Sequence, residues 1–182
     1  MVSQNSAFRY ALDAGAFYTG TLFLSSARSS CYTTPAIFEE VKHIKKSYGA
    51  IEALLESDSL QIVNSDRKNI EKVVAAARGT GDIVKLSQAD ISIIALALQL
   101  EIVLITNDNA VENVASTLKI PVKSTAGKGI KEIRKWIAFC SACGRAFGPT
   151  TKECRLCGNK LRRKYKVIEA NSTTISQSNI EL

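Results

Sequence analysis

Four of the five cysteines form two closely spaced pairs near the C-terminal end of the sequence. Cys140 and Cys143 make one Cys-x-x-Cys pair, Cys154 and Cys157 make the other, and a glycine follows each pair. Two such turns supply the four thiolates of a tetrahedral zinc site. Because four thiolates leave no open coordination position, we predict a structural Zn²⁺ ion and not a catalytic one. Disulfides or a redox pair are the alternatives.

Four acidic residues lie where predicted strands end or predicted helices run. Asp13 and Asp108 follow strands, Glu40 lies within a helix, and Asp90 opens another helix. In a doubly wound sheet, ligand sites lie at the carboxyl ends of the strands. Carboxylates gathered there repel one another unless a cation neutralises them, and oxygen ligands suit Mg²⁺ or Mn²⁺. The pattern predicts a divalent-cation site.

Each acid also has a purely structural interpretation. Asp90 could be only part of a capping box, Asp108 only the N-cap of the next helix, and Glu40 only a solvated charge on a helix. Asp13 is harder to explain in this way, because it follows a strand that must be buried. The combination of the four is more specific than any one of them.

The elements that must position these residues alternate along the first 120 residues. Strands are predicted over Phe8 to Leu12, Leu60 to Val63 and Ile102 to Ile105, with helical patterns between them. This alternation predicts an α/β fold, with a parallel sheet flanked by helices on both faces.

Local signals mark where three of the helices begin or end. Thr34-Pro35 is an N-cap followed by a first-turn proline, for a helix that runs to about Lys46. A second helix, Asn69 to Arg78, ends at Gly79-Thr80-Gly81. Ser87-Gln-Ala-Asp90 resembles a capping box before a helix so apolar that it must be central.

The net charge of +7 is a property of the C-terminal part. Residues 119–166 contain fourteen Lys or Arg and two acids, whereas residues 1–118 contain ten basic and thirteen acidic residues. Such a block suggests a polyanionic partner, and nucleic acid fits best, because each neutralised phosphate releases counterions. A merely solvated basic surface is the alternative.

Three segments surround the cysteines. Residues 124–130 are rich in small residues and mark a linker, and Ile130 to Ala138 is predicted to form a helix with an isoleucine face and a basic face. From Val167 onward the sequence is polar and predicted to be a flexible tail. Trp136 is expected to pack between this helix and a domain, and Tyr165 offers a stacking surface.

Several observations bear on where in the cell the protein is expected to act. The longest apolar run is far shorter than the ~20 residues of a membrane helix, so no membrane partner is expected. No secretory signal is read, which predicts a cytoplasmic protein. The single histidine, His43, and the fifth cysteine, Cys31, are given structural interpretations.

The order of the acidic motifs resembles that of PIN-domain ribonucleases over residues 8 to about 123. The motifs are Ala11-Leu-Asp13, Thr34-Pro-Ala-Ile-Phe-Glu-Glu40-Val, Leu86-Ser-Gln-Ala-Asp90 and Ile105-Thr-Asn-Asp108. Thr80-Gly-Asp82, the segment Gly129 to Trp136 and the four cysteines make the chain similar to the Nob (Nin-one-binding) branch. The resemblance implies four parts: a PIN domain over 7–123, a basic linker and helix over 124–138, a zinc ribbon over 139–167 and a flexible tail over 168–182.

The resemblance also implies roles for individual residues. Asp13, Glu40, Asp90 and Asp108 match the metal-binding acids of the family, and Thr106 matches a supporting hydroxyl. One departure is that Ala14-Gly15 stands where many PIN domains have a hydroxyl pair. Expected RNA contacts are Lys128, Lys131, Arg134, Lys135, Arg162, Arg163 and Lys164.

The activity implied is an endonuclease that makes the final cut at the 3′ end of small-subunit ribosomal RNA. Its implied partners are the precursor rRNA, the pre-small ribosomal subunit and other assembly factors, and its implied products carry 3′-hydroxyl and 5′-phosphate ends. A toxin-type PIN ribonuclease and a noncatalytic RNA-binding assembly factor are the alternatives.

Overall fold

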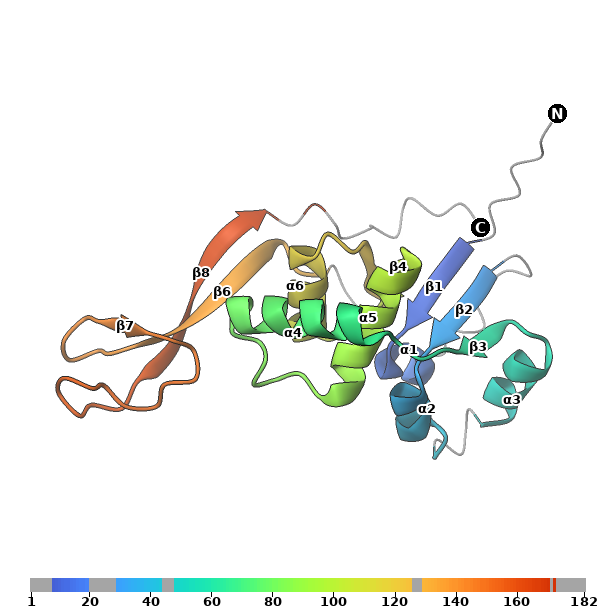
Figure 1. Ribbon diagram of the computed structural model, residues 1–182, viewed down its shortest axis with the longest axis horizontal. Helices are drawn as coiled ribbons and strands as arrows, with labels where there is room; N and C mark the ends of the chain where they lie inside the picture. Colours follow the sequence, from blue (N-terminus) through green and yellow to red (C-terminus); the bar gives the residue numbers. More distant parts are fainter. Residues whose placement is uncertain (1–7, 20–28, 44–47, 126–128, 171, 173–182) are drawn as a thin grey trace.

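The computed structural model describes residues 8–19, 29–43, 48–125, 129–170 and 172 of the chain. Figure 1 shows two parts along the long axis of the molecule: a sheet with its helices, and an elongated β-ribbon at the other end. In the described part, no helix is both long and apolar enough to cross a membrane.

The larger part is built on a parallel sheet of five strands in the order β3-β2-β1-β4-β5. The central strand β1 pairs with β2 on one side and with β4 on the other. The predicted α/β class is confirmed, and so are the three predicted strands to within one residue. The five strands are β1 (Phe8–Leu12), β2 (Ser29–Thr33), β3 (Leu60–Ile62), β4 (Val103–Ile105) and β5 (Val122–Lys123).

In the described part of the chain six helices flank this sheet, and two of them, α2 and α5, begin at the predicted caps. The Thr34 hydroxyl accepts from the Ile37 N–H, and Ser87 and Asp90 form the reciprocal capping box. The helix from Pro35 ends at Val41, and residues 44–47 lie outside the described part. The helices are α1 (Ala14–Tyr18), α2 (Pro35–Val41), α3 (Tyr48–Glu56), α4 (Arg67–Thr80), α5 (Gln88–Leu100) and α6 (Asn109–Thr117).

Helix α5 is central, as its apolar sequence predicts. Its residues 93–97 are all buried, and the helix contacts α2, α4, α6, β1 and β4. Because α5 begins at the capping box, this packing fixes the position of Asp90 relative to the first strand.

The smaller part is an antiparallel sheet in the order β7-β6-β8, from β6 (Glu132–Phe139), β7 (Ala146–Phe147) and β8 (Arg162–Ala170). The helix predicted over Ile130 to Ala138 is therefore wrong. A register shift between Ile133 and Arg134 breaks the two-residue alternation of β6, which leaves apolar residues at spacings that mimic a helix. The predicted tail is also wrong up to Ala170, because Val167 to Ala170 pair with β6 in β8.

Candidate functional site

Asp13 is the most constrained of the four predicted acids. It lies directly after β1 and caps α1, and it is 5% exposed. One carboxylate oxygen accepts from the Ala14 N–H at 2.7 Å, and the other accepts from the Thr106 hydroxyl at 2.6 Å. Thr106 is fully buried, and its hydroxyl is linked to the first and the last of the acids, because it donates to Asp13 and accepts from the backbone N–H of Asp108 at 3.1 Å.

Asp90 and Asp108 lie at helix starts near Asp13. Asp90 Oδ2 accepts from the Ser87 N–H at 2.7 Å, and Asp108 Oδ1 accepts from the Ala110 N–H at 2.6 Å. Asp90 is half-buried and Asp108 is exposed. Both residues are therefore caps, as their structural interpretation predicts. Each cap uses one carboxylate oxygen, so capping leaves acceptor capacity for a cation.

The charges that shift the pKa of Asp13 indicate that Asp90 and Asp108 lie in its neighbourhood. Burial raises the pKa of the Asp13 carboxyl above its ordinary value, the hydrogen bonds from Thr106 and Ala14 lower this pKa, and the carboxylates of Asp90 and Asp108 raise it. Strands β1 and β4 are paired neighbours, which brings Asp13 and Asp108, the acids that follow them, to one edge of the sheet, while Asp90 comes from the start of α5.

Glu40, the fourth predicted acid, is exposed on α2, whereas the charges that raise the pKa of Asp13 are those of Asp90 and Asp108. Within the described residues, no three acids bring their oxygens within 4.8 Å of one another. The donor set still fits a hard cation, because Mg²⁺ usually keeps several waters and binds through only one or two carboxylates.

The raised pKa of Asp13 predicts a pH-dependent effect of Asp13→Asn on stability. The folded chain binds the Asp13 proton more tightly than the unfolded chain does. The stabilisation from this bound proton is complete below the pKa that Asp13 has in the unfolded chain, and it is lost as pH rises through the pKa of Asp13 in the folded chain. Without added Mg²⁺ or Mn²⁺, Asp13→Asn should raise the melting temperature at neutral pH, and the gain should shrink as pH falls toward 4. The exposed Asp58, changed to asparagine, is the control; a gain that grows toward low pH would contradict the prediction.

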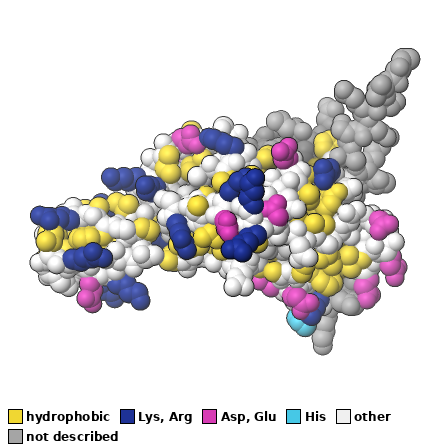
Figure 2. Space-filling view, viewed as in Figure 1, with side chains coloured by type: hydrophobic (Ala, Val, Ile, Leu, Met, Phe, Trp, Pro, Cys, Tyr) yellow, Lys and Arg dark blue, Asp and Glu magenta, His cyan; other side chains and the backbone are white. Residues whose placement is uncertain are grey.

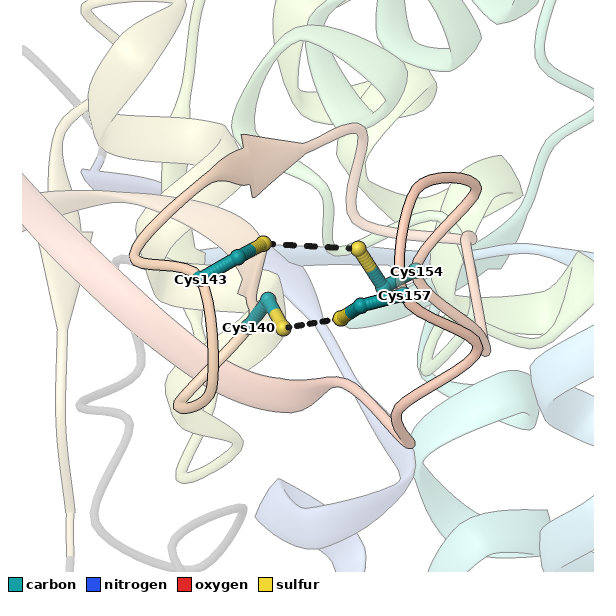
Figure 3. A group of neighbouring side chains, drawn as sticks. All are labelled: Cys140, Cys143, Cys154 and Cys157. Atoms are coloured by element: carbon teal, nitrogen blue, oxygen red, sulfur yellow. Dashed lines mark hydrogen bonds between the residues drawn. The ribbon is translucent and has the colours of Figure 1, made fainter.

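The four predicted zinc ligands come together at the far end of the ribbon. In Figure 3, Cys140 faces Cys157, and Cys143 faces Cys154. The Sγ atoms in these pairs lie 3.5 and 3.6 Å apart, and all four lie within 4.8 Å of one another. These distances are too long for disulfides, which are about 2.05 Å. Tetrahedral zinc with Zn–S bonds of about 2.3 Å places its sulfurs about 3.8 Å apart, so the cluster fits that ion.

The backbone around the cysteines repeats in both turns. Gly144 and Gly158 have φ of 72° and 68°, and their N–H groups donate to the carbonyls of Cys140 and Cys154. Hydrogen bonds from backbone N–H groups, above all that of Cys143, lower the pKa of Cys140 to about 6. The pKa of Cys154 is lowered as well, whereas the pKa of Cys143 is raised and that of Cys157 is raised to about 12, so two of the four thiols favour the thiolate, which is the form that binds a metal.

The predicted RNA contacts lie mainly on the ribbon. Figure 2 shows Lys and Arg side chains over this end of the molecule and more acidic side chains near the other end. Lys131, Lys135, Arg162 and Lys164 are exposed, whereas Lys128 lies outside the described residues. Arg134 and Arg163 differ from the rest because each also forms hydrogen bonds with the larger part of the molecule.

Two polar contacts beside the acids were not expected from the sequence. The hydroxyls of Thr34 and Ser92 lie 2.7 Å apart and join α2 to α5, the helices that carry Glu40 and Asp90. Asn107 Oδ1 accepts from the Ser124 hydroxyl and the Thr125 N–H, which ties the loop after β4 to the segment after β5. The sequence signal that could have pointed to Asn107 is its position between Thr106 and Asp108, two predicted site residues.

The remaining predictions for single residues are consistent with these surroundings. Cys31 is buried in β2, and His43 is exposed just after α2. Trp136 packs against Gly81 of the larger part, which confirms its predicted packing role, although it does so from a strand.

Comparison with known proteins identifies the family. Residues 11–100 match the model of the PIN domain of ribonuclease. The chain is 33% identical over 144 residues to Endoribonuclease Nob1 of Pyrococcus abyssi. This alignment covers 78% of this chain and 88% of that protein. It is 32% identical over 130 residues to Ribonuclease VapC1 of Thermoplasma acidophilum, covering 71% of this chain and 66% of that one.

A more distant relative is the 20S-pre-rRNA D-site endonuclease NOB1 of Saccharomyces cerevisiae. The identity is 37% over 79 residues, which make up 43% of this chain and 17% of the yeast protein. The match to the Pyrococcus protein extends over most of both chains, and the PIN match contains Asp13, Glu40 and Asp90. The chain is an endoribonuclease and belongs to the Nob1 family.

Proposed function

We propose that this endoribonuclease makes the final cut at the 3′ end of precursor small-subunit ribosomal RNA. The observation that supports the proposal is that the charges of Asp90 and Asp108 act on the buried Asp13, in a chain whose yeast relative is named a pre-rRNA endonuclease. The proposed partners are the precursor rRNA within the pre-small ribosomal subunit and other assembly factors, and the proposed location is the cytoplasm.

The proposed cation ligands are Asp13, Asp90 and Asp108, with Glu40 as the outermost member. When bound, Mg²⁺ or Mn²⁺ would activate a water for in-line attack on the phosphodiester and stabilise the leaving 3′ oxygen. The chain itself holds the carboxylates in place: Thr106 orients Asp13, and the capping bonds orient Asp90 and Asp108. The mutual repulsion of these carboxylates is relieved when a cation binds among them.

The four cysteines are proposed to hold one structural Zn²⁺ ion. That ion would fix the two turns at the end of the ribbon, and the ribbon would present Lys131, Lys135, Arg162 and Lys164 to RNA phosphates. Phosphate contacts position a nucleic acid without reading its sequence, so this surface is proposed to bind the RNA and not to select the cleavage site.

The substrate assignment can be tested with two RNAs of equal length, one containing the 3′ junction of the precursor and one with the junction sequence permuted. In Mn²⁺ or Mg²⁺, the parent chain should cut the first RNA at the junction and leave the second largely intact. Equal cutting of both RNAs would favour a PIN ribonuclease of broader substrate range, the alternative that the similarity to Ribonuclease VapC1 supports.

Replacing Thr106 with valine tests the role of its hydroxyl. The change keeps the shape but removes the 2.6 Å hydrogen bond to Asp13 and the bond from the Asp108 N–H to the same hydroxyl. A hydrogen bond to a charged group contributes about 1.5–3 kcal/mol, so we expect cleavage to slow by about tenfold or more. Thr117→Val, at the other end of α6, is the control, because its hydroxyl bonds only locally to the Asn113 carbonyl.

A further inference from the structure

The segment Thr80-Gly81-Asp82 joins α4 to the loop before α5 and lies against the ribbon. Gly81 has φ of 79° and ends α4 in the left-handed conformation. The Thr80 hydroxyl donates to the Ala77 carbonyl at 3.2 Å and accepts from the Asp82 N–H at 3.4 Å. The turn is therefore held in shape from within α4, and its Gly81 carbonyl and Asp82 side chain both contact Arg163 of the ribbon.

Asp82 is a buried charge at the contact between the two parts. It is 1% exposed, and its Oδ2 accepts from Asn113 Nδ2 at 2.6 Å. Its Oδ1 lies 3.5 Å from the guanidinium of Arg163 on β8, and the same guanidinium donates to the Gly81 carbonyl at 3.2 Å. A carboxylate this deeply buried requires such partners, and removing one partner of a buried pair is strongly destabilising.

Asn113 extends the network from α6 to β6. Its Nδ2 donates to the Arg134 carbonyl at 2.8 Å, and its Oδ1 accepts from the Arg134 N–H at 2.8 Å. The side-chain amide therefore pairs with one residue of β6 as a neighbouring strand would. This pairing falls at the register shift after Ile133, where β6 leaves its regular ladder with β8.

Close packing accompanies these polar contacts. A Cβ atom placed on Gly81 would lie 2.7 Å from Cβ of Pro149 and 3.0 Å from Cβ of Trp136. The Trp136 ring is covered by the Arg163 guanidinium at 4.1 Å. The ribbon therefore approaches the end of α4 more closely than any residue other than glycine allows.

The same elements carry two of the site acids. The loop from Asp82 leads directly into α5, which begins beside Asp90, and α6, which carries Asn113, is capped by Asp108. We infer that Thr80-Gly81-Asp82, with Asn113, is a socket that fixes the basic ribbon relative to the acidic site, with Asp82 as its central positioning residue. This inference rests on the proposed function: because the ribbon and the acidic site are held at a fixed distance, the preferred substrate is an RNA that contacts both of them at once.

The first test is structural and requires no catalysis. Residual dipolar couplings of backbone amides in residues 8–19, 29–43, 48–125 and 132–170 should fit one alignment tensor in the zinc-loaded parent. In Asp82→Asn they should require two tensors, because the amide has one acceptor oxygen where Asn113 Nδ2 and the Arg163 guanidinium both donate, and its NH2 group then faces a donor. Glu169→Gln is the matched control, since it also neutralises one acid of an ion pair between the parts, the exposed 2.7 Å pair with Lys119. It should keep one tensor.

The second test uses cleavage of a long RNA that reaches the ribbon and of a short one that reaches only the acidic site. Asp82→Asn should raise KM for the long RNA by about tenfold, because the ribbon then acts as a loosely tethered module. Its kcat, and both constants for the short RNA, should stay within about twofold of the parent. A parent that cuts neither RNA would contradict the proposed function, and the dipolar couplings would still decide whether the socket holds the two parts together.

A second variant keeps the inference testable if Asp82→Asn does not fold. Gly81→Ala leaves Asp82 in place but adds the colliding Cβ, and Gly144→Ala is its control, with a similar φ of 72° and open space around it. The dipolar couplings of Gly81→Ala should require two alignment tensors, whereas those of Gly144→Ala should fit one. The socket is refuted if Asp82→Asn, or Gly81→Ala in its place, keeps one tensor and the parent's KM for the long RNA.

Discussion

Replacing Asp90 with asparagine is expected to lower the rate of RNA cleavage by about a thousandfold or more. Asparagine keeps a side-chain oxygen that can accept from the Ser87 N–H, so this bond of the capping box survives the change. What is lost is the negative charge at the proposed cation site. A bound metal ion contributes several kcal/mol to transition-state stabilisation, and about 4 kcal/mol corresponds to a thousandfold in rate.

This substitution separates the two interpretations of Asp90. If the residue is only a cap, Asp90→Asn should cut RNA like the parent; if it binds the cation, the variant should melt like the parent but fail to cut. Asp66→Asn is the matched control, because Asp66 caps α4 through a 2.7 Å bond from the Asn69 N–H and takes no part in the proposed site. Initial rates in Mn²⁺ and thermal melts of the three proteins make the comparison.

Replacing Cys143 with serine is expected to abolish the fold of the distal ribbon. Structural zinc contributes about 10–16 kcal/mol to the folding of small zinc modules, and residues 140–158 contribute little buried apolar surface of their own. Elemental analysis should give one zinc per chain in the parent and much less in the variant, and amide signals of residues 140–158 should lose their dispersion.

Cys31→Ala is the control for this change. Cys31 is a buried thiol in β2, far along the chain from the cluster, so this variant should keep one zinc per chain and a folded ribbon. A Cys143→Ser protein with a folded ribbon and no zinc would contradict the assignment. Parent protein that is folded, reduced and free of zinc would contradict it equally.

Features fixed by a few neighbouring residues could be predicted from the sequence. The Thr34 and Ser87 caps depend only on side chains within one helical turn, and the glycines after Cys143 and Cys157 depend only on their own turns. The placement of Asp13 and Asp108 at one edge of the sheet followed from the rule that parallel strands end at one edge.

Features fixed by distant partners could not be predicted. Strand β6 was mistaken for a helix because its structure depends on pairing with β8, which follows the cysteine turns, and because its register shift disguises the strand pattern. The socket around Asp82 was missed for the same reason: Asn113 lies 31 residues away and Arg163 lies 81 residues away. Glu40 was predicted as a ligand, and this stays a prediction.

The chemistry of the RNA ends tests the central claim most directly. The parent chain, RNA spanning the 3′ junction, and Mn²⁺ or Mg²⁺ are incubated together, and both product ends are analysed by mass spectrometry. Water attack at an acid-bound cation predicts one cut at the junction, with a 3′-hydroxyl on the upstream product and a 5′-phosphate on the downstream one, and no cut without the divalent cation. A 2′,3′-cyclic phosphate, or cutting that persists without the cation, would contradict the account.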